Sequence, residues 1–127
     1  KRDFPALEII INGGIASWRE IDEHLRQVDG VMLGRVAYHE PWLLAVAGRE
    51  RNNVVQAMFA YAEEQTRSGV ALRHITRHML GLYHGCPHAR LWRRILSDPA
   101  RLAANDPRLL LEACEAVDPS PALPAAA

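Results

Sequence analysis

The stretch from residue 9 to residue 35 limits the fold most, because it reads as strand, turn, helix, strand and turn. The first strand is expected at 8–11, where isoleucines follow one another without polar alternation, as in a sheet covered on both faces. Ser17-Trp18-Arg19-Glu20 fits the capping box that begins a helix. This helix leads to a second strand at 28–33, so the order predicts two parallel strands joined by a right-handed crossover.

Each of these strands ends in glycine, at Asn12-Gly13-Gly14 and at Gly34-Arg35. Glycine has no Cβ, so a backbone N–H can come close to a ligand. In (β/α)8 barrels a phosphate cradle follows the last two strands, and a helix N-terminus can assist it. The pattern predicts a phosphate site formed by Asn12, Gly13, Gly14, Gly34 and Arg35. It suits a phosphate-bearing cofactor such as flavin mononucleotide (FMN) or a phosphorylated sugar, while plain strand-to-helix turns and an Arg35–Glu40 ion pair are the alternatives.

The rest of the chain is expected to be helical after a linker at 47–51, because apolar residues recur at helical spacing. Cap and proline signals predict where the helices begin. Asn52 or Asn53 would cap the first, Pro87 would lie in a first turn, and Asp98-Pro99 and Asp106-Pro107 would precede the last two. The predicted helices are 52–67, 71–84, 87–96, a short one near 101–104, and 108–117.

A basic block lies within these helices, although the whole chain has a net charge of zero. Residues 67–94 contain six arginines and no Asp or Glu, so the rest of the chain must carry −6. A solvated basic surface is the simplest interpretation, but two successive helices without a neutralising acid favour a polyanionic partner. Arginine suits RNA because its planar head grips phosphate and stacks on bases. The candidate RNA-binding residues are Arg73, Arg77, His78, Arg90, Arg93 and Arg94.

Several classes of protein are not indicated. At 127 residues the chain is too short for a complete (β/α)8 barrel, which needs roughly 200 residues or more. No apolar run approaches the ~20 residues of a membrane span, so no membrane is expected. Cys86 and Cys114 lack metal-ligand spacing and are expected to be partly buried. His74 and His78 lie one helical turn apart, but the glutamate of a metalloprotease helix is not between them. The sequence predicts no metal site and a reducing cytoplasmic location, and it gives Trp18, Trp42 and Trp92 packing roles.

Three stretches resemble the tRNA-dihydrouridine synthase family, and within it the A subgroup. They are Asn12-Gly13-Gly14-Ile15, the run from Asp29 to Tyr38 with Pro41, and the run from His74 to Gly85 that continues through Pro87, Ala89-Arg90 and Trp92-Arg93-Arg94. The similarity extends from about Phe4 to Leu111 but covers only the C-terminal third of a family member. It implies an α/β plus α fold: the last βαβ unit of a TIM (β/α)8 barrel at 1–47, then a small C-terminal helical bundle at 52–117. The tail at 118–127 is rich in proline and alanine and is expected to be disordered.

The resemblance also implies an activity. In this family the barrel holds FMN, and NADPH reduces the flavin. The flavin gives a hydride to a D-loop uridine of tRNA, and a cysteine protonates that uridine. Asn12, Gly13, Gly14, Gly34 and Arg35 match the FMN-phosphate turns, and the basic helices match the tRNA-binding surface. Neither cysteine matches the acid, so no catalytic residue is assigned and the isolated chain is expected to be inactive.

Three further possibilities follow from the sequence. The exposed strands are expected to pair with the missing barrel portion or with another copy of the chain. The chain could instead be a stand-alone RNA-binding helical module. It could also be an inactive structural fragment without redox activity.

Overall fold

The computed structural model describes residues 1–45 and 48–118. Contacts divide the chain into two compact units, Lys1–Ala45 and Val46–Ala127, and the structure describes residues 48–118 of the second. Except for Asp118, the expected disordered tail at 118–127 lies outside the described residues. Within the described ranges, no helix has both the length and the apolar character needed to cross a membrane.

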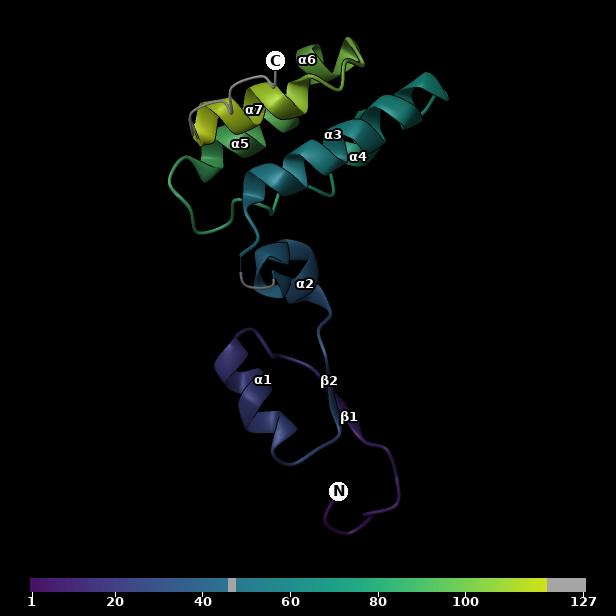
Figure 1. Ribbon diagram of the computed structural model, residues 1–127, viewed down its shortest axis with the longest axis vertical. Helices are drawn as coiled ribbons and strands as arrows, with labels where there is room; N and C mark the ends of the chain where they lie inside the picture. The colour runs from purple at the N-terminus through teal and green to yellow at the C-terminus, as the bar shows by residue number, and fades with distance from the viewer. Residues whose placement is uncertain (46–47, 119–127) are drawn as a thin grey trace. The chain divides into compact units, whose positions relative to one another are not determined.

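The first unit contains two short strands and three helical segments, labelled in Figure 1 where space allows. Strand β1 (Ile10–Asn12) pairs in parallel with β2 (Gly30–Met32), with Ile11 opposite Val31, and α1 (Trp18–Leu25) lies between them in the chain. The expected parallel pair is therefore confirmed, with strands shorter than 8–11 and 28–33. A short helix, α2 (Arg35–His39), and a 3-10 turn, η1 (Pro41–Leu44), follow where the sequence indicated only turns.

The capping box at the start of α1 is confirmed. The Glu20 backbone N–H donates to Ser17 Oγ at 3.3 Å, and the Ser17 hydroxyl donates to Glu20 Oε2 at 2.9 Å. The Glu20 carboxylate also accepts from the backbone N–H of Ala16 at 2.9 Å. These bonds fix the start of the helix immediately after the glycine turn, because one acid and one hydroxyl together hold the backbone at both ends of the first turn.

The first unit buries few apolar side chains. Only Ile15 and Ile21 of the buried hydrophobic residues lie in it, whereas Trp18 and Leu25 on α1 are 55% and 46% exposed. The packing role expected for Trp18, and the burial expected for both sheet faces, are therefore not observed. Two strands of three residues each offer too little surface to cover an amphipathic helix, so its apolar side chains stay exposed.

Acid should weaken the start of α1. Hydrogen bonds from the Ala16 N–H and the Ser17 hydroxyl hold the pKa of Glu20 below its ordinary value of 4.5. A carboxylate with a lowered pKa stabilises the folded state above its unfolded pKa, and that stabilisation disappears as the pH falls through the folded value. We expect the α1 amide hydrogens of Glu20→Gln to be less protected from exchange than those of the wild-type chain at pH 7, with the difference in protection vanishing toward pH 3.

Glu23→Gln is the matched control for this titration. It makes the same charge change on the same helix, and the Glu23 side chain forms no hydrogen bond or ion pair with the described residues. If the difference in the stability of α1 between Glu20→Gln and the wild type persists unchanged at pH 3, the ionised Glu20 carboxylate does not have the capping role.

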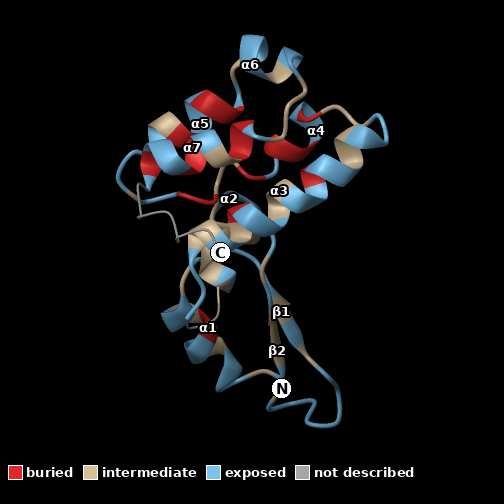
Figure 2. Ribbon diagram, turned by 45° about the horizontal axis from the view of Figure 1, so that its top comes forward, coloured by how far each residue is buried: buried red, intermediate tan, exposed pale blue. Residues whose placement is uncertain are grey.

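The second unit is helical. It contains α3 (Arg51–Arg67), α4 (Arg73–Thr76), α5 (Ala89–Leu96), α6 (Pro99–Ala103) and α7 (Leu109–Val117). Helix α7 packs against both α3 and α5, and Figure 2 shows the buried segments gathered on these helices and around α4. Val55, Leu72, Trp92 and Leu110 have no exposed surface, so this unit has a core of its own. The packing role expected for Trp92 is confirmed.

The helix expected at 71–84 is wrong beyond its first turn. Helix α4 ends at Thr76, and tighter turns follow in which the N–H of Met79 bonds to Thr76 O and that of Leu82 to Met79 O. Side chains from other helices supply the reason. Trp92 Nε1 donates to the Met79 carbonyl at 2.9 Å, and Arg51 Nε donates to the Leu82 carbonyl at 2.9 Å. These carbonyls have tertiary donors, so the backbone does not need an α-helix to satisfy them.

Three helix beginnings also differ from expectation. Helix α3 begins at Arg51 with Glu50 as its N-cap, so Asn52 and Asn53 lie inside the helix. Helix α5 begins at Ala89, so Pro87 is outside the helix. The preceding residue, His88, has a left-handed φ of 60°, and the Ala89 N–H closes a turn onto the Cys86 carbonyl. Asp98 caps α6 as expected. Asp106 accepts from the Arg108 N–H, but α7 begins one residue later, at Leu109.

Candidate functional site

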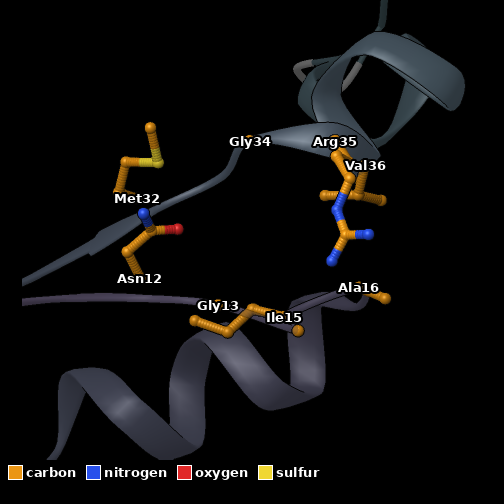
Figure 3. A pocket seen from close by; sticks show the side chains of 9 residues that line it. Asn12, Gly13, Ile15, Ala16, Met32, Gly34, Arg35 and Val36 are labelled. Atoms are coloured by element: carbon orange, nitrogen blue, oxygen red, sulfur yellow. The ribbon is translucent and has the colours of Figure 1, made fainter.

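The two glycine turns line one pocket in the first unit. It has a volume of about 540 Å³ and is shown in Figure 3. Asn12, Gly13, Gly14, Gly34 and Arg35 all line it, together with Ile15, Ala16, Met32 and Val36. The parallel strands bring both turns to the same end of the sheet, so the topology explains why turns from two different strands meet. Their role in binding phosphate stays a prediction.

Backbone forms much of the pocket wall. Gly13 and Gly14 have φ values of 124° and 68°, which side-chain-bearing residues rarely adopt. Gly34 has an ordinary negative φ, and a Cβ built on it would lie 3.9 Å from the Met32 sulfur, an ordinary contact. The backbone N–H groups of Gly14 and Gly34 donate no hydrogen bond to any acceptor within residues 1–45 and 48–118. These two groups are thus donors available to an anionic ligand.

Arg35 provides the positive charge of the pocket. Figure 3 shows its guanidinium extending across the pocket toward the Ile15-Ala16 turn. It is exposed and forms no ion pair with any described residue, so the alternative pairing with Glu40 is not observed.

The first turn of α1 contributes less than the sequence suggested. The Ala16 and Glu20 N–H groups are already bonded within the capping box, and the Glu20 carboxylate is itself an acid. The start of α1 therefore offers fewer donors, whereas Gly34, Arg35 and Val36 at the start of α2 line the pocket. Help from a helix N-terminus stays a prediction.

A second hollow lies on helix α5 and has a volume of about 650 Å³. It brings together three of the candidate RNA-binding residues, Arg90, Arg93 and Arg94. Cys86, His88, Ala89 and Leu91 complete its lining, and we call this surface the α5 hollow. The other candidates, Arg73, Arg77 and His78, are exposed on α4 and the turn that follows it, and they do not line the hollow.

The arginines of the basic block differ in their partners from those elsewhere in the second unit. Arg101 pairs with Glu112 at 3.6 Å, and Arg108 pairs with Asp106 at 3.1 Å. Within the described ranges, none of the guanidiniums of Arg73, Arg77, Arg90, Arg93 and Arg94 forms an ion pair or a hydrogen bond. Such uncompensated charge raises the local concentration of anions and suits a polyanionic partner.

The cysteines do not form a reactive pair or a metal centre. Cys114 is buried and lies 3.3 Å from the Tyr83 hydroxyl; burial raises the pKa of the Cys114 thiol above its ordinary value, which disfavours the reactive thiolate. Cys86 is half-buried at the α5 hollow. Across the part of the chain that the structure describes, no three His, Cys, Asp or Glu side chains gather as a metal-ligand set.

Sequence reasoning did not anticipate Cys86 and His88 in the α5 hollow, nor Arg51 as a donor to the Leu82 carbonyl. For the hollow, the run Gly85-Cys86-Pro87 was the available signal, because glycine and proline on either side of a residue mark a sharp turn that exposes its neighbours.

The chain has a parallel strand pair with glycine turns at one end, followed by a basic helical unit. Residues 1–118 match the family model of dihydrouridine synthases. The chain belongs to the dihydrouridine synthase (Dus) family. The family resemblance drawn from the sequence is thereby confirmed.

Three curated relatives named tRNA-dihydrouridine(20/20a) synthase illustrate the similarity. The protein of Salmonella typhimurium strain LT2 is 49% identical over 127 residues, covering 92% of this chain and 38% of the relative. That of Escherichia coli K12 is 47% identical over 127 residues, covering 92% of this chain and 37% of the relative. That of Synechocystis is 44% identical over 126 residues, covering 91% of this chain and 38% of the relative. The chain thus spans little more than a third of the length of these relatives.

Proposed function

We propose that this chain forms part of an FMN-dependent tRNA-dihydrouridine synthase, an oxidoreductase that reduces D-loop uridine in tRNA with NADPH. Family membership and the names of the relatives support the reaction. The observation that carries the proposal for this chain is the meeting of both glycine turns and Arg35 on one pocket. A basic helical unit in the same chain supports a contact with tRNA.

The residues of the pocket fit the phosphate of FMN. The Gly14 and Gly34 N–H groups would donate to its oxygens, and the Arg35 guanidinium would offset its charge. Bound flavin would supply the hydride that reduces the uracil ring. Neither cysteine of this chain matches the acid of the family, so the part proposed for this chain is to bind the phosphate and to contact tRNA.

In this proposal the first unit is the last βαβ unit of a TIM barrel, and further strands complete it. Apolar side chains of Phe4, Leu7, Ile10 and Met32 are about half exposed or more, which supports a partner surface on this unit. That partner would be the remaining barrel portion, or a second copy of the chain. A tRNA-modifying enzyme of this kind would act in the cytoplasm.

A second candidate is a stand-alone RNA-binding module. It is favoured by one observation: the second unit, which carries the basic block, has its own buried core. Both candidates place RNA on the same arginines, and only the first requires flavin.

Binding of this chain to tRNA over a salt series tests the RNA contact. We expect preferential binding over a duplex RNA of equal length, with the logarithm of the affinity falling steeply as the logarithm of salt rises, by ~0.7 to 0.9 per phosphate neutralised. Equal binding of both RNAs, or no salt dependence, would contradict recognition by the basic block.

A further inference from the structure

Residues 77–88 have no regular helix, yet their backbone has a defined shape. We call this segment the 77–88 loop. Its turns are closed by backbone bonds from Leu82 N–H to Met79 O, His84 N–H to Gly81 O and Cys86 N–H to Tyr83 O. It joins α4 to the start of α5, so it connects both groups of candidate RNA-binding arginines.

Two donors from other helices hold the loop. Trp92 Nε1 on α5 donates to the Met79 carbonyl at 2.9 Å, and Arg51 Nε on α3 donates to the Leu82 carbonyl at 2.9 Å. Trp92 has no exposed surface. Removing a donor would leave a carbonyl short of a partner, so each bond fixes the loop at that point.

Tyr83 follows these two fixed points in the chain and connects the loop to three helices. Its side chain is buried, with 3% exposed. Its ring lies 4.7 Å from the Trp92 ring and 5.7 Å from Arg51 Cζ, and its hydroxyl lies 3.3 Å from Cys114 Sγ on α7. One side chain of the loop thus contacts residues of α3, α5 and α7.

The basic side chains of the same segment are all exposed. Arg77, His78, His84 and His88 are exposed, whereas Met79, Leu82 and Tyr83 are buried. His88 and Cys86 at the end of the loop also line the α5 hollow with Arg93. The loop therefore presents basic side chains to solvent from a backbone that is anchored from within the unit.

We propose that Tyr83, aided by Arg51, is a positioning residue that holds the 77–88 loop in an RNA-binding shape before RNA arrives. This rests on the proposed function, because it takes tRNA as the ligand. A loop that is already ordered avoids the conformational entropy that binding would otherwise cost. Tyr83 need not touch RNA itself, since it is buried.

The test compares Tyr83→Leu with Tyr83→Phe in the full chain, using tRNA binding over a salt series and amide hydrogen exchange. Tyr83→Leu should bind about tenfold more weakly, because freeing even one loop residue costs about that factor. Its salt slope should equal that of the wild type, since every phosphate-binding side chain is still present. Tyr83→Phe keeps the ring and should bind within about twofold of the wild type. Faster exchange should be confined to residues 77–88.

Arg51→Met is the second variant, should Tyr83→Leu fail to fold. It removes the hydrogen bond that Arg51, at the start of α3, donates to the Leu82 carbonyl. Arg49→Met is its control, because it makes the same charge change two residues earlier. Only Arg51→Met should weaken binding.

A folded Tyr83→Leu that binds like the wild type, or whose salt slope is smaller, would overturn the positioning role alone. A wild-type chain that does not bind tRNA would overturn the proposed RNA contact and this inference with it.

Discussion

Glutamate in place of Gly34 should lower the affinity for FMN by about a thousandfold. Gly34 lines the pocket with Gly14 and Arg35, so the new carboxylate would face the phosphate. Two like charges about 4 Å apart repel by ~4 kcal/mol at an effective dielectric of ~20, and each ~1.4 kcal/mol is a factor of ten. A suitable protein is the Escherichia coli K12 relative in which residues 1–118 replace the matching segment. Flavin retained on purification, followed by titration with FMN, gives the measurement.

Gly34→Gln is the matched control, because it has the same shape without the charge. A Cβ there meets only the Met32 sulfur at 3.9 Å, and both variants place a side chain of the same size on the same backbone, so the difference between them reports the charge. Gly13→Glu should also release flavin, but there the φ of 124° adds strain to charge. If Gly34→Glu keeps as much flavin as Gly34→Gln, the phosphate assignment is wrong.

Replacing both Arg93 and Arg94 with glutamine should weaken tRNA binding by about a hundredfold. Both residues line the α5 hollow, and their guanidiniums form no ion pair with the described residues. A hydrogen bond to a charged group contributes about 1.5–3 kcal/mol, which is about tenfold or more for each arginine. The slope of log affinity against log salt should become shallower by about one for each phosphate that an arginine no longer binds. Fluorescence anisotropy of labelled tRNA over a salt series gives both quantities.

Arg101→Gln with Arg108→Gln is the matched control. It removes the same charge from the same unit, but these arginines already pair with Glu112 and Asp106. Its affinity should stay within a few-fold of the wild type, because only the long-range field changes. Equal weakening in the two double variants would mean that tRNA senses net charge and not the α5 hollow.

Local signals in the sequence were enough for much of the first unit. The Ser17–Glu20 box marked the start of α1, and the apolar runs on either side marked strands that pair in parallel. The meeting of Gly13 and Gly34 followed from the same topology, because parallel strands bring their carboxyl ends together. The exposure of Trp18 did not follow, since burial depends on how many strands lie beneath the helix and not on the spacing of its apolar residues.

In the helical unit, the spacing of apolar residues did not predict where the helix after Leu72 ends. Leu72, Ile75, Met79 and Leu82 recur at helical spacing and are all buried, yet the helix stops at Thr76. What replaces it depends on donors that are distant in sequence: Arg51 lies 31 residues before Leu82, and Trp92 lies 13 after Met79. A periodic pattern reports which side chains face the core, but not whether their carbonyls bond to the next turn or to another helix.

The uneven distribution of buried side chains bears on how the polypeptide acquires its structure during translation. Among the described residues, the second unit contains all of the buried hydrophobic side chains except Ile15 and Ile21, so its core forms from its own stretch of sequence. The strand pair lacks such a core and gains stability only when other strands cover it. Within this chain, synthesis therefore produces the dependent strand pair before the unit that has its own core, and the strand edges stay exposed until other strands cover them.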